Sequence, residues 1–233
     1  METMRMNVSS ALKDGKADYL KEERVALRYS FLKREGLENE PLLPLPADAS
    51  KRRYFRLPQA LLMDAPPPEK TIPFQNIAEF LGKTGLSVPR IYVADHTHGF
   101  LLIEDLGELT YRKAIETGLS EPLLYGETIK ALIHLHQQVQ ENTLKFPPYN
   151  FEAFFKEIDV FIEWYGLSFS EKSRQELREM WKEAYENQPV LPQSFVLRDV
   201  LIDNLLWLPS RIGFHRSGFI DFQDGLWGPI TYD

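Results

Sequence analysis

Two apolar stretches that enclose acids and an amide stand out in this sequence. The first reads F-V-L-R-D-V-L-I-D-N-L-L-W-L over residues 195–208, and the second reads F-I-D-F-Q-D over residues 219–224. Asp199 and Asn204 stand five residues apart, and Asp221 follows seventeen residues later. Two strands joined by a polar, turn-rich loop would bring Asn204 and Asp221 together.

The R-D-x4-N string has two interpretations. Taken alone it is common by chance, and Asp and Asn often do no more than form turns. Protein kinases, however, place a catalytic Asp and a metal-binding Asn at this spacing, with a second metal-binding Asp downstream. Because Asp221 closes a second apolar run, we favour the functional interpretation. Asp199 is then the base for an acceptor hydroxyl, and Asn204 and Asp221 are Mg²⁺ ligands in an ATP-dependent phosphotransferase.

Composition narrows the class of protein. The 233 residues are enough for one large domain or two small lobes, and 43% of them are hydrophobic. The net charge of −7 argues against a nucleic-acid partner. The chain contains no cysteine, which excludes thiol chemistry and disulfides. No apolar run approaches the ~20 residues of a membrane span, and the first 18 residues lack a signal-like apolar core, so we expect no membrane partner and a cytoplasmic location.

The spacing of apolar residues predicts a chain of the α+β class with two lobes. Residues 1–105 are expected to form a small, β-rich, nucleotide-binding lobe, and residues 106–233 a mainly helical lobe that carries the catalytic and metal loops. A cleft between the lobes is the expected cofactor site. Strands are predicted at 54–57, 60–64, 90–94 and 99–104, and helices at 20–35, 74–84, 110–117, 122–140, 151–165 and 171–187.

Several motifs, in order from residue 46 to the last residue, carry a family likeness. The chain resembles the aminoglycoside phosphotransferase and choline kinase superfamily, and within it the bacterial branch of cell-wall amino-sugar kinases that act on N-acetylmuramate and N-acetylglucosamine. The matching pieces are P-A-D-A-S-K-R-R-Y-F-R (46–56), L-L-M-D-A-P-P (61–67), G-F-L-L-I-E-D-L-G (99–107), L-I-H-L-H (132–136), L-R-D-x4-N (197–204) and I-D-F-Q-D-G-L-W-G-P-I-T-Y-D (220–233).

The resemblance implies a protein-kinase-like fold, ATP and Mg²⁺ as cofactors, and a sugar or amino sugar as the small-molecule acceptor. By the same resemblance Asp48 and Ser50 belong to the loop that covers the phosphates, where backbone N–H groups could cradle oxygens. Glu104 to Leu106 resembles the hinge whose backbone groups bind the adenine edge. The alternative for this segment is a plain loop with solvated acids.

Two positions in the nucleotide-binding half depart from the kinase pattern. Kinases use a lysine on the third strand to contact the phosphates, and Met63 stands where that lysine is expected. Arg53 or Arg56 could supply the charge from the neighbouring strand, since a guanidinium suits phosphate, or both could simply be solvated. The basic cluster Lys51, Arg52, Arg53 and Arg56 is the local positive site that an acidic kinase would need.

The catalytic half departs in two further ways. Leu197 and Leu201 occupy places where the superfamily usually has histidines. The family also continues with further helices beyond the Y-D that ends this chain, so we expect a truncated larger lobe. These departures keep open a second hypothesis: a catalytically impaired kinase-like protein with a nucleotide-binding or regulatory role. Four aromatic residues in the helical half are expected in the core rather than in a cation-binding cage: Trp164, Tyr165, Trp181 and Trp207.

Overall fold

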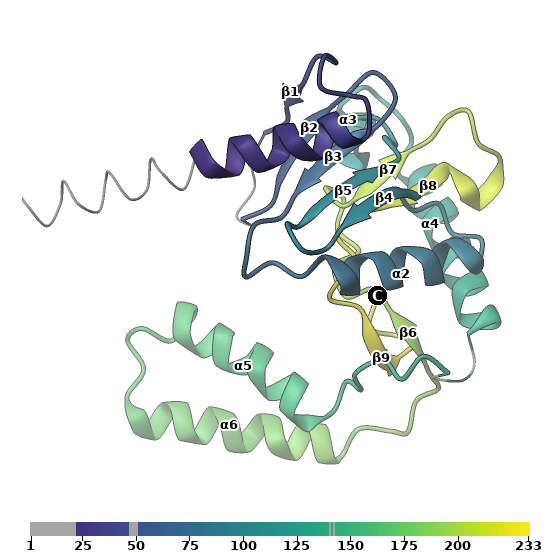
Figure 1. Ribbon diagram of the computed structural model, residues 1–233. Helices are drawn as coiled ribbons and strands as arrows, with labels where there is room; N and C mark the ends of the chain where they lie inside the picture. The colour runs from purple at the N-terminus through teal and green to yellow at the C-terminus, as the bar shows by residue number, and fades with distance from the viewer. Residues whose placement is uncertain (1–21, 47–50, 140, 142) are drawn as a thin grey trace, which may run out of the picture. The chain divides into compact units, whose positions relative to one another are not determined.

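The computed structural model describes residues 22–46, 51–139, 141 and 143–233 (Figure 1). The chain divides into two compact units. The first contains the described residues up to Asn76 together with Pro89–Asp105, and the second contains Ile77–Val88 and Leu106–Asp233. Asp48 and Ser50, predicted to cover the phosphates, lie outside the described residues. The assignment of nucleotide binding to residues 1–105 and of catalysis to residues 106–233 stays a prediction.

An antiparallel sheet forms the framework of the first unit. Its strand order is β1-β2-β3-β5-β4. Leu57 donates from its backbone N–H to the carbonyl of Ala60 at 2.9 Å, which closes the β2–β3 hairpin around Pro58 and Gln59. The strands are β1 (Leu43–Pro44), β2 (Arg53–Arg56), β3 (Leu61–Asp64), β4 (Ile91–Asp95) and β5 (Phe100–Ile103).

A helix over the described residues 22–34 packs on this sheet and completes its core. Phe31 and Phe100 are both buried, and their ring centroids lie 5.4 Å apart. Leu62 and Leu102 belong to the same cluster. Phe100 and Leu102, which share one face of β5, therefore meet the apolar face of the helix in one hydrophobic core.

A buried carboxylate lies at the end of β3. Asp64 is only 2% exposed, and it follows Met63, which is also buried. Arg24 donates from Nε to Asp64 at 2.7 Å, and Arg28 donates to the other carboxylate oxygen at 3.2 Å. A charge removed from water is tolerated only when it is paired and hydrogen-bonded, and these two guanidinium groups meet that condition.

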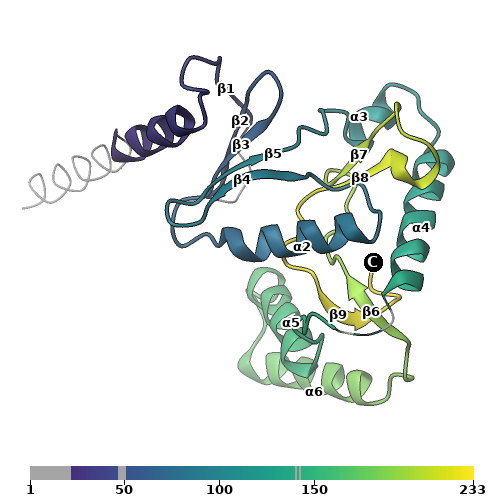
Figure 2. The ribbon, with the colours of Figure 1, turned by 45° about the vertical axis from the view of Figure 1, so that its right-hand side comes forward.

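Helices are the longest elements of the second unit. Side-chain caps start three of them: Thr110 accepts from the backbone of Lys113, Asn150 from Ala153, and Ser170 from Ser173. Figure 2 shows α5 and α6 side by side as an antiparallel hairpin. The helices are α2 (Thr71–Lys83, shared by both units), α3 (Tyr111–Glu116), α4 (Glu121–Gln138), α5 (Phe151–Tyr165) and α6 (Glu171–Glu186).

Two short antiparallel strand pairs complete the second unit. Strand β6 (Gln193–Val196) pairs with β9 (Leu226–Pro229), and β7 (Leu205–Trp207) pairs with β8 (Ser217–Phe219) after the short helix η1 (Gly213–Arg216). Phe195 on β6 is fully buried, and its ring centroid lies 4.5 Å from that of Phe146 and 5.2 Å from that of Phe80. The predicted α+β class is confirmed.

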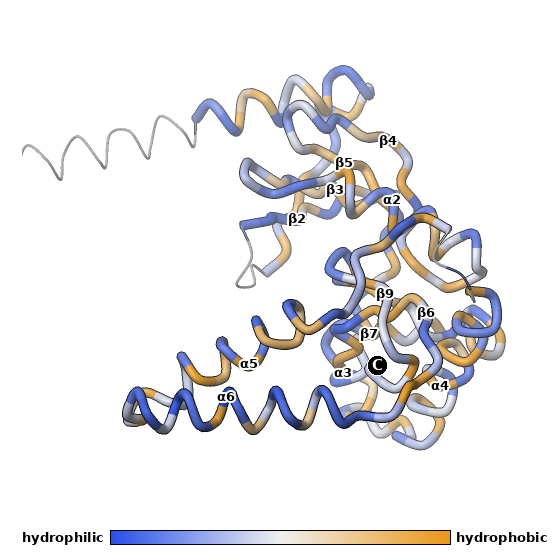
Figure 3. Tube along the Cα trace, turned by 90° about the horizontal axis from the view of Figure 1, so that it is seen from below, coloured by the Kyte–Doolittle hydropathy of each residue, from blue (hydrophilic) through white to orange (hydrophobic). Residues whose placement is uncertain are grey.

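The helical hairpin corrects one expectation about the core. Trp164 and Tyr165 are 73% and 75% exposed, and Trp181 is 40% exposed, whereas Trp207 is buried as predicted. Apolar spacing identifies a face of a helix but not whether another element covers that face. Ile162 is the buried side chain of α5, and α6 buries none of its described side chains; Figure 3 shows isolated hydrophobic positions along a largely hydrophilic α6. Among the described helices, none is both long and apolar enough to cross a membrane.

Candidate active site

Asp199 lies in the loop between β6 and β7. The backbone N–H of Leu201 donates to the Asp199 carbonyl at 2.8 Å, and the N–H of Asn204 donates to the Leu201 carbonyl at 2.8 Å. The side-chain amide of Asn204 then reaches back to the Asp199 carbonyl at 3.1 Å. Asn204 therefore closes the loop on Asp199, and the five-residue spacing read from the sequence becomes a compact turn.

The β7–β8 pair brings Asn204 and Asp221 together, as expected for two strands joined by a polar loop. Leu205 lies opposite Phe219, so Asn204 and Asp221 occupy the same end of the pair. The backbone N–H of Ile220 donates to the Asn204 carbonyl at 3.0 Å. Asp221 has a φ of +60°, a left-handed conformation that residues other than glycine rarely adopt. Such conformations persist where the surrounding structure over-determines them, which is common at functional sites.

The three predicted residues share one electrostatic environment. Asp199, Asn204 and Asp221 are all half-buried. Burial raises the pKa of Asp199 above its ordinary value, and the negative charge of Asp221 raises it further, whereas Arg198 opposes the shift. A carboxyl whose proton affinity is increased in this way is better suited to accept a proton than a fully solvated one.

Asp233 holds the loop from the other side, a role that no motif in the sequence predicted. Its two carboxylate oxygens accept hydrogen bonds of 2.8 Å from the backbone N–H groups of Leu197 and Arg198. Burial raises the pKa of Asp233, and the two N–H donors act against that shift. The Y-D pair that ends the last motif was the available signal, but nothing in the spacing showed that its carboxylate would reach residues 197 and 198.

A second polar network surrounds Glu157 on α5. Arg198 donates to its Oε1 at 2.6 Å, Tyr232 donates to the same oxygen at 2.9 Å, and Tyr149 donates to Oε2 at 2.7 Å. Burial, and next the hydrogen bond to Glu157, raises the pKa of Tyr149, so its hydroxyl remains a donor. Arg198 itself has a φ of +75°. Glu157 lies 41 residues before Arg198, so the sequence held no local signal for this network.

The residues predicted to bind nucleotide are largely engaged inside the first unit. Arg56 donates from Nε to Asp105 at 2.5 Å and from Nη2 at 3.2 Å. Glu104 donates from its backbone N–H to the Arg90 carbonyl at 2.8 Å and accepts from the Arg90 side chain at 3.1 Å. Arg53 is exposed on β2, and Leu106, in the second unit, is half-buried. The roles proposed for these residues stay predictions.

The donor set at the end of the β7–β8 pair fits a magnesium ion. Asn204 and Asp221 offer an amide oxygen and a carboxylate, which are ligands that Mg²⁺ prefers. No group of three or more His, Asp or Glu side chains that could cage a metal occurs within the described residues. Mg²⁺ in phosphotransferases commonly takes one or two protein ligands and completes its shell with waters and phosphates. Two protein ligands are therefore sufficient for an ion shared with a nucleotide.

Comparison with known proteins gives a family for this geometry. A model described as "Phosphotransferase enzyme family" matches residues 41–233. Curated relatives named N-acetylmuramate/N-acetylglucosamine kinase include a Pseudomonas aeruginosa protein with 33% identity over 202 residues, covering 82% of this chain and 57% of that protein. A Caulobacter vibrioides protein of the same name is 28% identical and is covered to 71%. The chain thus spans a little over half the length of the Pseudomonas relative.

Solved structures extend the likeness at the level of the fold. The gentamicin complex of the aminoglycoside phosphotransferase APH(2″)-IIa matches with a TM-score of 0.63 at 16% identity, covering 88% of this chain and 72% of that one. A choline/ethanolamine kinase family protein from Mesorhizobium loti matches with a TM-score of 0.56 at 18% identity, covering 82% and 61%. The expected kinase-like fold and the expected family resemblance are both confirmed.

Proposed function

The chain belongs to the phosphotransferase enzyme family, and from this premise we propose that it transfers the γ-phosphate of ATP, with Mg²⁺, to a hydroxyl group of a small molecule. The likeness to proteins named as amino-sugar kinases supports a sugar or amino sugar as the acceptor. A reaction that consumes ATP also fits the cytoplasmic location that the sequence predicts.

One observation carries the proposal: the turn that Asn204 closes on Asp199, next to the strand pair that joins Asn204 to Asp221. In our proposal the Asp199 carboxylate orients the acceptor hydroxyl and takes its proton as the new bond to the γ-phosphorus forms, while the bond from that phosphorus to the bridging oxygen breaks and ADP leaves. Asp233 fixes the backbone that precedes Asp199, so the carboxylate is aimed before the acceptor arrives. Positioning of this kind accounts for most of the catalysis in phosphoryl transfer.

We assign the Mg²⁺ ligands to Asn204 and Asp221. When bound, Mg²⁺ would neutralise charge on the phosphate oxygens. For the nucleotide we assign Arg53 and Arg56 to the phosphates and the backbone of Glu104 to Leu106 to the base, while Asp48 and Ser50 remain assigned from the resemblance alone. Arg56 would have to exchange its carboxylate partner Asp105 for phosphate, which its planar donor fork permits.

The second hypothesis is a kinase-like protein that binds nucleotide without turnover. Met63 is 1% exposed on β3, so the position of the expected lysine is a packed core position. The carboxylate of the next residue, Asp64, already accepts hydrogen bonds from Arg24 and Arg28. These observations favour impaired phosphate contacts, while the acid and amide set at Asp199, Asn204 and Asp221 favours turnover.

Thermal stability and ADP release separate the two hypotheses. A nucleotide binder should gain about 2.7 kcal/mol of unfolding free energy when ATP and Mg²⁺ are present at about a hundredfold excess over the dissociation constant. ADP release should then be measured over a panel of sugars, amino sugars and amino alcohols, with wild type and Asp199→Asn compared. We expect Asp199→Asn to keep the ATP stabilisation and to lose ~10² to 10⁴ in rate. A variant that keeps wild-type turnover would remove Asp199 from its assigned role.

A further inference from the structure

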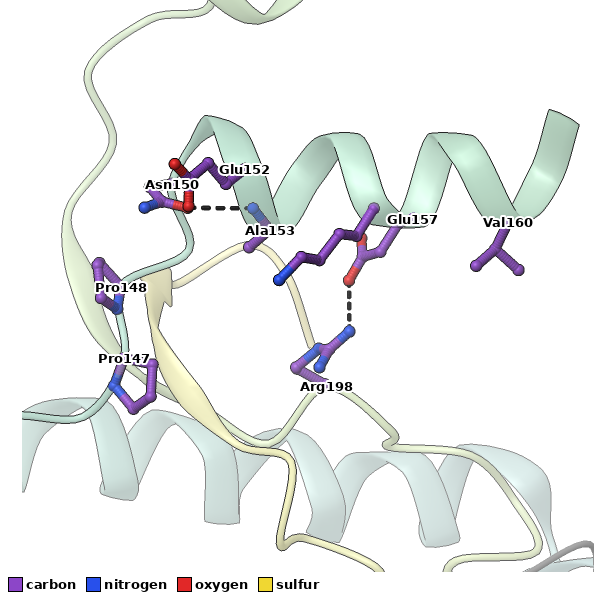
Figure 4. Close-up of a pocket in the computed structure, with 9 residues that line it drawn as sticks. Pro147, Pro148, Asn150, Glu152, Ala153, Glu157, Val160 and Arg198 are labelled. Carbon is purple, nitrogen blue, oxygen red and sulfur yellow. Dashed lines mark hydrogen bonds and ion pairs between the residues drawn. The ribbon is translucent and has the colours of Figure 1, made fainter. Parts of the chain in front are cut away.

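Arg198 precedes Asp199 in the chain, and its side chain is held by Glu157 of α5. The Nη2 atom of Arg198 donates to Oε1 of Glu157 at 2.6 Å, and Figure 4 shows the guanidinium turned toward that carboxylate. The Nη1 atom of the same side chain lies 3.5 Å from the carbonyl oxygen of Asp224, in the segment that also carries Asp221. One side chain therefore links α5, the loop of Asp199 and the segment of the proposed metal ligand.

Glu157 is itself fixed by two tyrosines. Tyr149 donates to its Oε2 at 2.7 Å, and Tyr232 donates to its Oε1 at 2.9 Å. The two tyrosine rings pack edge to face, with their centroids 4.9 Å apart. The backbone N–H of Tyr149 also donates to the carbonyl of Trp227 on β9 at 2.7 Å. The carboxylate that receives Arg198 is therefore tied to the strand pair as well as to its own helix.

The conformation of Arg198 needs support at both ends of the residue. Its φ of +75° is left-handed, and such a conformation persists only where the surroundings over-determine it. Asp233 accepts from the backbone N–H, and Glu157 holds the guanidinium. The Arg198 side chain keeps 30% of its surface exposed and lines a cavity of about 630 Å³, so close packing does not enclose it on that side. The ion pair with Glu157 therefore sets the position of the guanidinium.

We propose that Glu157 is a positioning residue for phosphoryl transfer: it holds the side chain of Arg198 and, through it, the orientation of Asp199. This inference rests on the proposed function, in which Asp199 takes the proton of the acceptor. A misplacement of about 1 Å in a supporting group is enough to cost ~10² in rate. The ion pair itself is about one-third exposed, and solvated pairs contribute little to stability. Loss of the pair should therefore slow the reaction without unfolding the protein.

Glu157→Gln tests this role, and Asp159→Asn is the matched control. Glutamine keeps the shape of the side chain and an acceptor oxygen but removes the charge that holds Arg198. Asp159 lies on the same helix, in an ion pair of 2.8 Å with Arg178 that joins the two helices of the hairpin.

The measurement is ADP release with N-acetylglucosamine, an acceptor that the names of the curated relatives contain. We expect Glu157→Gln to lower kcat by about tenfold to a hundredfold, while the dissociation constant for ATP with Mg²⁺ and the urea midpoint stay as in wild type. Asp159→Asn should keep the wild-type kcat. Equal kcat values in the two variants would refute the positioning role.

A double-mutant cycle shows whether Glu157 acts through Arg198. Arg198→Met removes the guanidinium but keeps an unbranched side chain in its place. In that background Glu157→Gln has no cation left to release, so kcat should fall no further than in Arg198→Met alone. If the losses of the two single variants multiply in the double variant, Glu157 acts by another route and the inference is overturned.

Hydrogen exchange measured by NMR gives a readout that needs no turnover. The backbone N–H of Arg198 is bonded to Asp233, so its exchange rate reports how well this segment is held. We expect exchange at Arg198 to become about tenfold faster in Glu157→Gln and to stay as in wild type in Asp159→Asn.

The two readouts separate this inference from the proposed function. If wild type releases no ADP but exchange at Arg198 responds to Glu157→Gln as expected, the phosphotransferase proposal fails and the hold of Glu157 on the loop stands. If ADP is released but neither kcat nor exchange distinguishes Glu157→Gln from Asp159→Asn, the role of Glu157 is refuted and the phosphotransferase proposal stands.

Discussion

Asp233 holds Arg198 by its backbone: Oδ1 of Asp233 accepts a 2.8 Å hydrogen bond from the N–H of Arg198. The other carboxylate oxygen accepts from the N–H of Leu197 at the same distance. Arg198 has a positive φ, so the segment before Asp199 is bent into a conformation that needs outside support. The carboxylate of Asp233 supplies that support, and it ties residue 233 to the loop that carries Asp199.

Asp233→Asn should therefore weaken the fold and the activity together. The amide keeps one acceptor oxygen but turns an N–H₂ group toward a backbone donor, which leaves one N–H unsatisfied at a cost of about 1–3 kcal/mol. Urea unfolding measures that loss, and any ADP-releasing activity should fall with it. Asp203→Asn is the control, because the Asp203–Arg112 pair is half exposed to solvent and should contribute little to the free energy of unfolding. Equal unfolding midpoints for the two variants would mean that the hydrogen bonds from Leu197 and Arg198 to Asp233 contribute nothing to stability.

Asp221→Ala should remove the Mg²⁺ dependence of ATP binding. In our assignment Asp221 supplies the carboxylate ligand and Asn204 the amide ligand, so the variant loses the charged half of the pair. Titration of Mg²⁺ against bound nucleotide is the measurement. Asp224→Ala, three residues on and exposed, is the control and should keep the wild-type response. If ATP binding by Asp221→Ala depends on Mg²⁺ as in wild type, then Asp221 has a structural role and is not a metal ligand.

Asp64→Ala should destabilise the first unit by about 3 kcal/mol, since removing one member of a buried ion pair leaves the other charge uncompensated. Arg24 and Arg28 each keep 17% of their side-chain surface exposed. Water can therefore solvate their freed charges in part, which limits the loss of stability. A double-mutant cycle with Arg24→Ala measures the coupling. If the double variant is as unstable as the sum of the single variants, the pair is not coupled.

The sequence predicted the elements better than the contacts between them. The β2–β3 hairpin, α5 and the neighbourhood of Asn204 and Asp221 follow from local signals, namely turn residues and the period of apolar positions. The strand before Asp199 pairs with β9 rather than with β7, because pairing between distant strands depends on packing that local patterns do not encode.

The sequence also did not predict which side chains pair over long distances along the chain. Nothing in the spacing linked Glu157 to Arg198, or Arg56 to Asp105, since such pairs are 41 and 49 residues apart. Trp164 and Trp181 were misplaced for a related reason, because the apolar face of a helix shows the capacity to be buried and not the element that buries it.

The acid sensitivity of the first unit should depend on Asp95. Burial raises the pKa of this carboxyl, but hydrogen bonds from His98 and from Arg34 outweigh burial and lower the pKa overall. A lowered folded-state pKa means that the stabilisation is present above the unfolded-state pKa of ~3.9 and is lost as the pH falls through the folded-state value. Asp95→Asn should flatten the acid limb of a plot of unfolding free energy against pH. An acid limb identical to that of wild type would show that other carboxyls dominate.

Gly225→Ala should destabilise the segment that links the loop of Asp221 to β9. A Cβ built on Gly225 would lie 2.3 Å from the Cζ atom of Phe195, a ring that is fully buried against Phe80 and Phe146. Phe195 cannot yield without disturbing those contacts, so overpacking of about 1–3 kcal/mol is expected. Chemical denaturation measures the loss.

Gly126→Ala is the matched control for this change. Gly126 lies inside α4, and a Cβ there meets no atom within 4 Å, so the same substitution should stabilise the protein by about 0.5–1 kcal/mol through helix propensity. Combining Gly225→Ala with Phe195→Leu should recover part of the loss, because the smaller side chain vacates the clashing position. If Gly225→Ala is as stable as Gly126→Ala, the close packing of Gly225 on Phe195 does not constrain the loop that carries Asp221.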